Sequence, residues 1–427
     1  MNDPRTLLLT SQPPGGCGVG QIYVDSLCRL LPERTVAVAA LLSADDDWTA
    51  DGDVSLLGHQ RFVRRYESVY RPWRGVVGEA AAAAGVVGLL QRHARQLVAQ
   101  AAEWADAMAV DRVMAILDCP LTMLMAAPLA DRLQLPLHTL VWDVPEHVLP
   151  GFGHTSWSAR PLKGGFDAAL QRSRGVAVMS RAMQRRFEDD YGARTTILRQ
   201  PIEAAWKSDV GDAALRNSDE FVIGFAGSVT ARDEVETLCR TLDGMNWRLD
   251  GRQVRLRVFG LRFVCQAQTS RWIEYRGYVP ETADVVAGLA ECDLLFLPQP
   301  FGERGRPFAE YSFPTKFTTY LAAGRPMLVL SPAYSALGEF CREHELPIVC
   351  DRLEESAIRE FLQRLAGDGD RMGDIEERLR EVAAAEFGPP LAQARLAEWL
   401  SEHVSHSKSA ALPQREINEV HAVVSHH

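Results

Sequence analysis

Short apolar runs alternate with longer amphipathic stretches along the first half of the chain. The apolar runs, each ending near a turn or polar residue, lie at 6–10, 36–42, 113–118, 137–143, 175–180 and 195–201. The stretches with helical spacing lie at 19–31, 86–108, 121–133 and 181–191. Because strands that alternate with helices form parallel sheets covered on both faces, this half predicts an α/β domain.

A second alternating series follows a polar segment at 203–220, which we interpret as a linker. Its apolar runs lie at 221–227, 254–260, 272–279, 293–300 and 326–332. Its predicted helices lie at 233–242, 282–290, 313–323, 352–366, 372–384 and 389–403. The series predicts a second α/β domain. The expected divisions are an N-terminal domain at 1–202, a C-terminal domain at 203–388, a final helix at 389–404 and a disordered tail at 405–427.

Composition limits the function classes. Apolar residues make up 47% and charged residues 24% of the 427 positions, as in ordinary globular proteins. The formal net charge of −10 argues against a nucleic-acid partner, since such binders carry a basic footprint. No apolar run reaches the roughly 18 residues of a membrane-spanning helix, so we expect a cytoplasmic protein. The scattered cysteines contain no C-x-x-C pair and predict single thiols rather than a metal site.

A glycine-rich loop, SQPPGGCGVG at 11–20, directly follows the first predicted strand and opens a helix. Gly16 and Gly18 lack side chains, so backbone amides can approach an anion at the helix N-terminus. Gln21 stands where a dinucleotide-binding motif has its third glycine, and the loop lacks the Lys-Ser/Thr pair of a Walker A motif. The alternative is a tight turn that binds no ligand.

A second motif is SFPTKFTTYLAAGRPMLVLSP at 312–332. We predict Ser312 as the N-cap of a helix, with Pro314 in the first turn and Gly324 just past the end. Free amides at 313–315 together with Lys316 would then hold a diphosphate. The alternative is a well-capped helix without a ligand.

In this order the motifs resemble the GT-B glycosyltransferases, specifically the retaining, nucleotide-sugar-dependent group that builds bacterial polysaccharides and glycolipids. The resemblance rests on GGCGVG at 15–20, GFAGSVTARDEVETL at 224–238, YRGYVPETADVVAGLAECDLLFLP at 275–298 and FPTKFTTYLAAGRPML at 313–328. It implies two Rossmann-like domains that face a cleft, with the C-terminal helix packed back on the N-terminal domain. It also implies an enzyme that needs no metal and no cofactor.

The resemblance further implies a donor-binding set. Glycine and hydroxyl residues would lie against the diphosphate, and the segment after Arg276 would flank the nucleobase. The implied residues are Gly16, Gly18, Gly227, Ser228, Gly277, Tyr278, Val279, Glu310, Phe313, Thr315 and Thr319. Lys316 would act on the leaving nucleoside diphosphate, whose growing negative charge needs fixed donors and cations.

Two positions depart from the pattern of this group. Ser228 stands where members usually carry an arginine, and we expect Arg232 to substitute for it as a catalytic cation. Thr319 stands where members carry the second of two glutamates. We expect Glu303 and Glu310 to take over part of that role. A threonine can still hydrogen-bond a ribose hydroxyl, but it is a weaker acceptor than a carboxylate.

A polar cluster, VWDVPEHVLPGFGH at 141–154, follows another predicted strand. Asp143 is the first choice for a catalytic group at the reacting sugar, where it would orient the acceptor or stabilise an oxocarbenium-like centre. The alternative for Asp143 is a turn or N-cap residue before Pro145. His147 and His154 are expected to be packing or surface residues.

The segment HQRFVRRYESVYRPWRGVV at 59–77 is a basic stretch in an acidic chain. Arg64, Arg65 and Trp73 combine cations with an aromatic side chain, a pattern typical of contact with anionic lipid headgroups or a lipid-linked acceptor. The alternative is a solvated amphipathic loop or helix.

Together these features predict transfer of a sugar from a nucleoside-diphosphate donor to a hydroxyl of a sugar, lipid-linked or small-molecule acceptor. Two alternatives remain open at this point, because a fold does not fix a function. One is a sugar epimerase or hydrolase on the same scaffold. The other is a non-catalytic subunit that binds a nucleotide and supports a partner enzyme.

Overall fold

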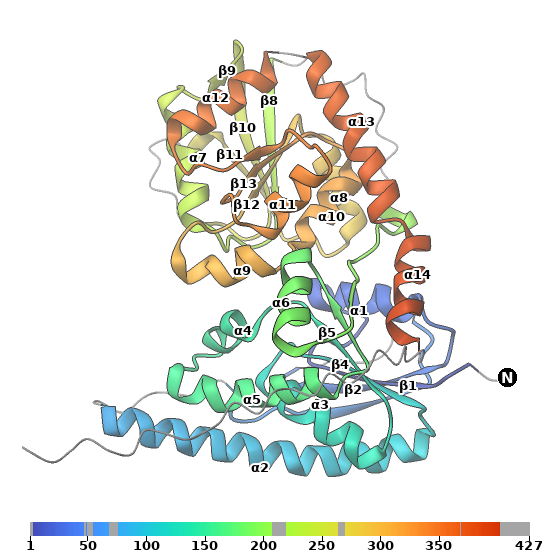
Figure 1. Cartoon of the computed structure of the whole chain (residues 1–427). Helices are drawn as coiled ribbons and strands as arrows, with labels where there is room; N and C mark the ends of the chain where they lie inside the picture. Colours follow the sequence, from blue (N-terminus) through green and yellow to red (C-terminus); the bar gives the residue numbers. More distant parts are fainter. Residues whose placement is uncertain are drawn as a thin grey trace, which may run out of the picture.

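The computed structural model describes residues 3–46, 48, 54–67, 76–206, 219–263, 270–367 and 369–401. These residues form two parallel sheets covered by helices, with one domain standing above the other in Figure 1. The arrangement confirms the expected pair of Rossmann-like domains. The expected tail at 405–427 lies outside the described residues, as does 207–218 of the expected linker.

The N-terminal sheet is wholly parallel and has the strand order β3-β2-β1-β4-β5-β6-β7. Its strands are β1 (Thr6–Thr10), β2 (Val36–Leu42), β3 (Gly58–Val63), β4 (Arg112–Ile116), β5 (Leu137–Val141), β6 (Gly175–Val178) and β7 (Thr195–Ile197). The order reverses direction between β1 and β4, the point at which such sheets bind ligands.

Both faces of this sheet are buried, which explains its unbroken apolar runs. Leu8 packs with α1 in one core, whereas Leu7 and Leu9 pack with α2 and α3 in the other. The helices are α1 (Val19–Arg29), α2 (Val76–Met108), α3 (Pro120–Leu133), α4 (Pro145–Gly151), α5 (Ser156–Arg172) and α6 (Arg181–Tyr191). In Figure 1, α2 runs along the lower side of the domain and α1 lies on the side that faces the other domain.

The C-terminal sheet has the order β11-β10-β8-β12-β13-β14, with the short β9 antiparallel to β10. Its strands are β8 (Glu220–Ala226), β9 (Arg248–Leu249), β10 (Arg252–Phe259), β11 (Ile273–Gly277), β12 (Leu294–Pro298), β13 (Met327–Leu330) and β14 (Val349–Cys350). The order reverses direction between β8 and β12.

Helices of the C-terminal half cover this sheet and then return to the first domain. They are α7 (Arg232–Gly244), α8 (Thr282–Ala290), α9 (Arg306–Tyr311), α10 (Thr315–Ala323), α11 (Ala336–Glu343), α12 (Glu355–Ala366), α13 (Gly369–Glu386) and α14 (Pro389–Leu400). Within the described part of the chain, no helix is long and apolar enough to cross a membrane.

The last helix, α14, packs on the N-terminal domain, as expected. The indole of Trp399 donates to the Gly175 carbonyl at 3.1 Å, and the Trp399 carbonyl lies 3.0 Å from Nδ1 of His138. A Cβ atom at position 175 would lie only 2.8 Å from that same carbonyl oxygen, so glycine permits the close approach. The chain therefore crosses between the domains twice, once near Ile202 and once near Phe387, and the Ile202 amide donates to the Phe387 carbonyl at 2.8 Å.

Several elements differ from the sequence prediction. Residues 58–63 form the edge strand β3, parallel to β2, where a loop or helix was expected. Ser312 is not an N-cap: it ends α9, and Pro314 is the N-cap of α10. No helix was predicted between 300 and 312, where the structure has α9, and α5, α11 and β14 were also missed. The described cysteines form no disulfide, and all but Cys17 are buried.

Candidate functional site

Two adjoining cavities lie between the carboxyl ends of the two sheets. The first, which we name the acidic cavity, has a volume of about 420 Å³ and is lined by Asp118, Asp143 and Gln299 among others. The second, the apolar cavity, has about 370 Å³ and is lined by Trp206, Tyr278 and further apolar side chains. Both are bordered by the same four residues, Val19, Ser228, Thr315 and Lys316.

The acidic cavity lies where each sheet reverses its strand order. Gln12 follows β1 and Asp118 follows β4 in the N-terminal sheet, whereas Ser228 follows β8 and Gln299 follows β12 in the C-terminal sheet. Parallel sheets leave a crevice at this reversal, outside the carboxyl ends of the strands. The geometry of both domains therefore converges on one site.

Two helix N-termini border the cavities from opposite domains. Val19 begins α1, and Thr315 and Lys316 begin α10. The first amides of a helix lack partners within it and carry partial positive charge, so such ends attract anions. The boundary between the two cavities is thus suited to a negatively charged group.

Lys316 adds a full charge at this boundary. Its Nζ donates to the Ser228 carbonyl at 2.6 Å and lies 4.6 Å from the centre of the Phe225 ring. Within the described part of the chain, no carboxylate lies within ion-pair distance of this ammonium. Burial lowers the pKa of Lys316 to about 8. A cation held without a counter-ion is favourable only when an anion binds beside it.

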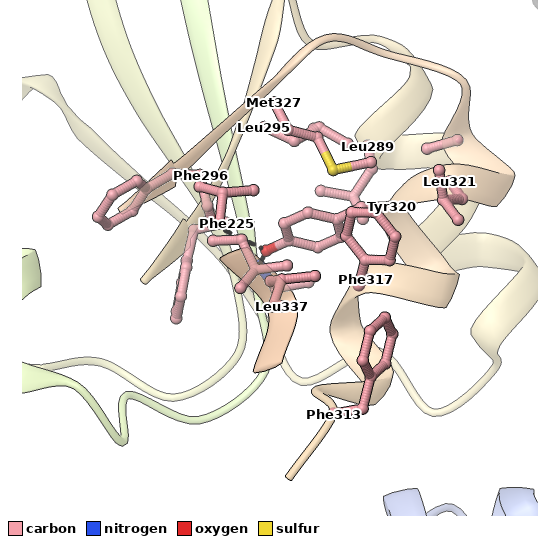
Figure 2. Close-up of a cluster of buried hydrophobic side chains, with 14 of the residues drawn as sticks. Phe225, Leu289, Leu295, Phe296, Phe313, Phe317, Tyr320, Leu321, Met327 and Leu337 are labelled. Carbon is pink, nitrogen blue, oxygen red and sulfur yellow. Dashed lines mark hydrogen bonds between the residues drawn. The ribbon is translucent and has the colours of Figure 1, made fainter. Parts of the chain in front are cut away.

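The backbone around Lys316 is fixed by its neighbours. Gly227 has φ of +86°, and a Cβ atom there would lie 3.0 Å from Cε of Lys316. In Figure 2 the Tyr320 hydroxyl points from α10 toward the sheet. It accepts from the Ala226 amide at 2.8 Å and donates to the Phe296 carbonyl at 3.2 Å. These bonds hold the middle of α10 against the ends of β8 and β12.

Asp118 is a carboxylate of the N-terminal wall that the sequence analysis did not select. It accepts from the Ser11 amide at 3.1 Å, the Ser11 hydroxyl at 2.9 Å and the Thr122 hydroxyl at 3.2 Å. Burial outweighs these donors and raises the pKa of Asp118 to about 6. The signal in the sequence was its place as the last residue of the run VMAILD, directly at the end of a predicted strand.

Asp143 lies on the same wall and joins the two domains. Its carboxylate accepts from the Ser312 hydroxyl of the other domain, and burial raises the pKa of Asp143. Nearby, the Ser180 hydroxyl donates to the Tyr311 carbonyl at 2.5 Å, and the rings of His147 and Phe308 are 4.9 Å apart. The segment that leads into α10 is therefore anchored on the N-terminal domain.

The remaining residues of the predicted set divide into three groups. The apolar cavity is lined by Gly18, Gly227, Tyr278, Val279 and Thr319, and the acidic cavity by Phe313. Neither cavity is lined by Gly16, Gly277, Arg232 or Glu310.

Four of the predicted positions therefore have other surroundings. The space beside Gly16 is filled by the Gln21 side chain, so this glycine makes room for protein rather than ligand. Arg232 is exposed in the first turn of α7. Glu310 pairs with Arg306 at 3.2 Å and borders a separate groove with Arg186 of the N-terminal domain. Gly277 has φ of +79° and supports the turn before Tyr278.

The described arginines of the basic segment at 59–77 do not line either cavity. Arg64 pairs with Glu67 at 3.3 Å, and Arg61 donates to the Ser43 and Ala44 carbonyls at 2.9 and 2.8 Å. Arg65 borders a groove between β3 and α2, and Trp73 lies outside the described residues. Among the described residues, no group of three or more His, Cys, Asp or Glu side chains is placed to hold a metal ion.

Two further residues of the acidic cavity were missed by the sequence analysis. Trp142 follows β5 and Gln299 follows β12. The indole nitrogen of Trp142 and the amide nitrogen of Gln299 are buried and have no hydrogen-bond partner among the described residues. Gln299 lies between two prolines, and Trp142 lies in the polar cluster at 141–154, where Asp143 was selected instead.

No protein-family model and no curated protein sequence matches this chain. The structure is similar to that of Anabaena HepE in complex with UDP and glucose, at 16% identity and a TM-score of 0.62, over 92% of this chain and 98% of that one. Sucrose-phosphate synthase from Thermosynechococcus elongatus matches at 13% identity and a TM-score of 0.65, over 92% and 98%. An α,α-trehalose-phosphate synthase (UDP-forming) from Burkholderia xenovorans, in complex with glucose-6-phosphate, matches at 12% and 0.60, over 93% and 100%. The likeness spans both domains, and the chain has the two-domain GT-B fold.

Proposed function

We propose that this protein is a glycosyltransferase that moves a sugar from a nucleoside-diphosphate donor to a hydroxyl of an acceptor. The observation that carries the proposal is Lys316, a cation at the boundary of two cavities and at the start of a helix, with no counter-ion among the described residues. A diphosphate supplies the missing negative charge. The neighbours of the same fold that are described with UDP or UDP-glucose support this assignment.

The two cavities divide the substrates. The apolar cavity, bordered by Gly18, Tyr278 and Val279, would take the nucleoside. The diphosphate would lie over Ser228, Thr315 and Lys316, and the transferred sugar would extend into the acidic cavity.

During transfer, the bond between the anomeric carbon and the phosphate oxygen breaks, the acceptor oxygen bonds to that carbon, and the proton of the acceptor hydroxyl passes to the leaving diphosphate. The leaving diphosphate gains negative charge, which Lys316 and the amides at the start of α10 stabilise. Asp118 orients the acceptor hydroxyl by accepting its hydrogen bond. Retention at the anomeric carbon follows from the resemblance of the sequence motifs. As the resemblance of the motifs implies, we expect these steps to proceed without a metal.

The acceptor we propose is a sugar or another small hydroxyl compound rather than a membrane lipid. Arg61 and Arg64, the described cations of the basic segment that make side-chain bonds, are engaged by carbonyls and by Glu67. The charges of these two arginines are therefore not free to bind anionic headgroups.

The test is a binding and turnover screen. Wild-type protein is titrated with ADP, GDP, UDP and dTDP, and then with the corresponding glucose and galactose conjugates, by calorimetry. We expect one base to bind in the micromolar range. Release of that nucleoside diphosphate from its sugar conjugate, dependent on an added acceptor, supports the transferase.

The alternatives give other results in this screen. Release of the nucleoside diphosphate without any acceptor favours a hydrolase, and a change of the sugar while it stays on the nucleotide favours an epimerase. Binding without turnover over a broad acceptor panel favours the non-catalytic subunit. Absence of binding for all four nucleoside diphosphates contradicts the proposal.

A further inference from the structure

The acidic cavity contains a side chain whose polar group is only half satisfied. Gln299 follows β12, is fully buried and lines this cavity. Its amide oxygen accepts from the Ser331 hydroxyl at 2.6 Å, whereas its amide nitrogen has no partner among the described residues. A buried donor without an acceptor costs free energy, and natural proteins rarely keep one without a function.

The orientation of this amide is set by its surroundings. The backbone N–H of Gln299 donates to the Leu330 carbonyl at 2.8 Å, which continues the ladder between β12 and β13. The Ser331 and Ser335 hydroxyls are hydrogen-bonded to one another at 2.6 Å, and Ser335 accepts from the Gly338 amide at 2.9 Å. A chain of bonds that begins at the N-terminus of α11 therefore ends on the oxygen of Gln299.

This position is on the C-terminal wall, at the same sheet edge as Ser228 and Lys316. A group bonded directly to a diphosphate over Lys316 would extend into the acidic cavity along this wall. Under the proposed function that group is the transferred sugar. Its hydroxyl oxygens are acceptors, and they match the free N–H of an amide.

We propose that the Gln299 amide is a specificity-determining contact, which donates a hydrogen bond to one hydroxyl oxygen of the transferred sugar. The inference rests on the proposed function and adds to it the residue that recognises the sugar. A site built to hydrogen-bond a substrate hydroxyl discriminates against analogues that lack it, because its own polar group is then left unpaired.

The first experiment replaces the amide with an apolar group of similar length, Gln299→Met. Affinities are measured by calorimetry for the nucleoside diphosphate that the screen selects and for its glucose or galactose conjugate, whichever binds wild type more tightly. We expect the conjugate to bind about 5- to 20-fold more weakly, the value of one hydrogen bond to a sugar. The nucleoside diphosphate alone should bind within about twofold of wild type, since Gln299 does not line the apolar cavity.

Thermal stability separates recognition from a structural role. The Gln299 nitrogen bonds no described residue, and Ser331 keeps Ser335 as a partner, so Gln299→Met should not lower Tm. A fall in Tm together with equal losses for both ligands would show that Gln299 only supports the fold. The matched control is Gln253→Met, at the opposite end of the same sheet, where the amide donates to the Trp247 carbonyl at 2.7 Å. It should change neither affinity.

The second experiment locates the hydroxyl. The 2-, 3-, 4- and 6-deoxy forms of the same sugar conjugate are titrated into wild type and Gln299→Met. One deoxy form should bind the two proteins equally, because the hydrogen bond is absent from both complexes. If all four forms keep the full difference between the proteins, the contact does not exist and the inference is wrong. If wild type binds none of the nucleoside diphosphates, the proposed function fails first, and the inference fails with it.

A third variant tests the orienting bonds. Ser331→Ala removes the donor that holds the Gln299 oxygen, so the amide can rotate away from the sugar. We expect a loss of about 2- to 5-fold for the sugar conjugate and none for the nucleoside diphosphate. An unchanged affinity for the conjugate would contradict the orienting role of this serine.

Discussion

The two walls of the acidic cavity differ in charge. The N-terminal wall presents two carboxylates, Asp118 and Asp143, and the C-terminal wall presents the ammonium of Lys316. Burial acts on both walls toward the neutral form: it raises the pKa of the carboxylates and lowers that of the lysine. Among the described residues, no group of opposite charge lies within ion-pair distance of Asp118, Asp143 or Lys316.

This difference indicates a division of labour between the domains. A diphosphate needs cations and helix N-termini, which the C-terminal wall supplies. A hydroxyl acceptor needs a carboxylate that accepts its hydrogen bond, which the N-terminal wall supplies. The buried charges on each wall are unfavourable until the substrate binds beside them. Because each wall binds a different substrate, a substitution on one wall should leave the function of the other largely intact.

The largest effect is expected from Lys316→Met. Lys316 is the only cation among the described residues that borders both cavities, so its loss should weaken nucleoside diphosphate binding by about 100-fold, measured by calorimetry. Tm should not fall, because a lysine with a lowered pKa in the folded state disfavours folding wherever it is charged in the unfolded chain. The control is Lys163→Met, which removes the ion pair between Lys163 and Asp167 within α5. Unchanged binding would disprove the phosphate assignment.

Asp118→Asn should affect the other wall. The amide keeps the shape but removes the charge that orients the acceptor hydroxyl, so we expect turnover to fall by about 30- to 100-fold. Affinity for the nucleoside diphosphate should stay within about twofold. Turnover is measured with saturating donor and a varied acceptor. Asp131→Asn, an exposed ion-pair residue, should leave turnover unchanged. Equal losses in binding and turnover would contradict the division between the walls.

The functions of the two walls should also depend on pH in opposite directions. The pKa of Lys316 is lowered to about 8, so nucleoside diphosphate affinity should fall as pH rises from 7 to 10. The pKa of Asp118 is raised to about 6, so turnover should fall as pH drops below that value. Each limb can change by up to about tenfold per pH unit.

Each limb of this profile should depend on its own residue. The alkaline limb should disappear in Lys316→Met, and the acidic limb should disappear in Asp118→Asn. Persistence of either limb in its variant would assign it to another group.

The smallest effect is expected where the walls meet. Ser312→Ala removes the donor that joins α9 to Asp143 and leaves this carboxylate unpaired across the domain boundary. We expect turnover to fall by about 3- to 10-fold and nucleoside diphosphate affinity to stay near the wild-type value. Ser173→Ala, which removes a hydroxyl bonded within the N-terminal domain, is the comparison. A stronger effect on binding than on turnover would show that Ser312 acts on the diphosphate instead.

The elements that were predicted correctly from the sequence are those whose apolar pattern reflects burial. The bounds of β2 and α8 agree with the prediction, because continuous apolar runs and turn residues marked both ends. The edge strand β3 was missed since its outer positions are polar and exposed, so its pattern did not differ from that of a solvated loop. Ser312 was taken for an N-cap because its partner, Asp143, is 169 positions away in the sequence.

The site was predictable only in part for a related reason. Lys316, Gly227 and Tyr278 belong to local motifs, and the structure brings these three residues to the apolar cavity. Asp118 and Gln299 belong to no motif, and Trp142 was not selected within the cluster at 141–154. The three residues come together because the strand orders of the two sheets bring their loops to facing edges. Sheet order is a long-range property that local periodicity does not encode.

The double crossing near Ile202 and Phe387 has a mechanical consequence. Two adjacent crossing segments joined by a backbone hydrogen bond connect the domains along one line, so a rotation of one domain against the other would turn about that line. Arg199 lies at this line, its guanidinium 4.3 Å from the centre of the Phe313 ring and 5.9 Å from that of Phe387. Because Phe313 also lines the acidic cavity, a change in the angle between the domains reaches the cavity wall through a stack of planar groups rather than through a flexible loop.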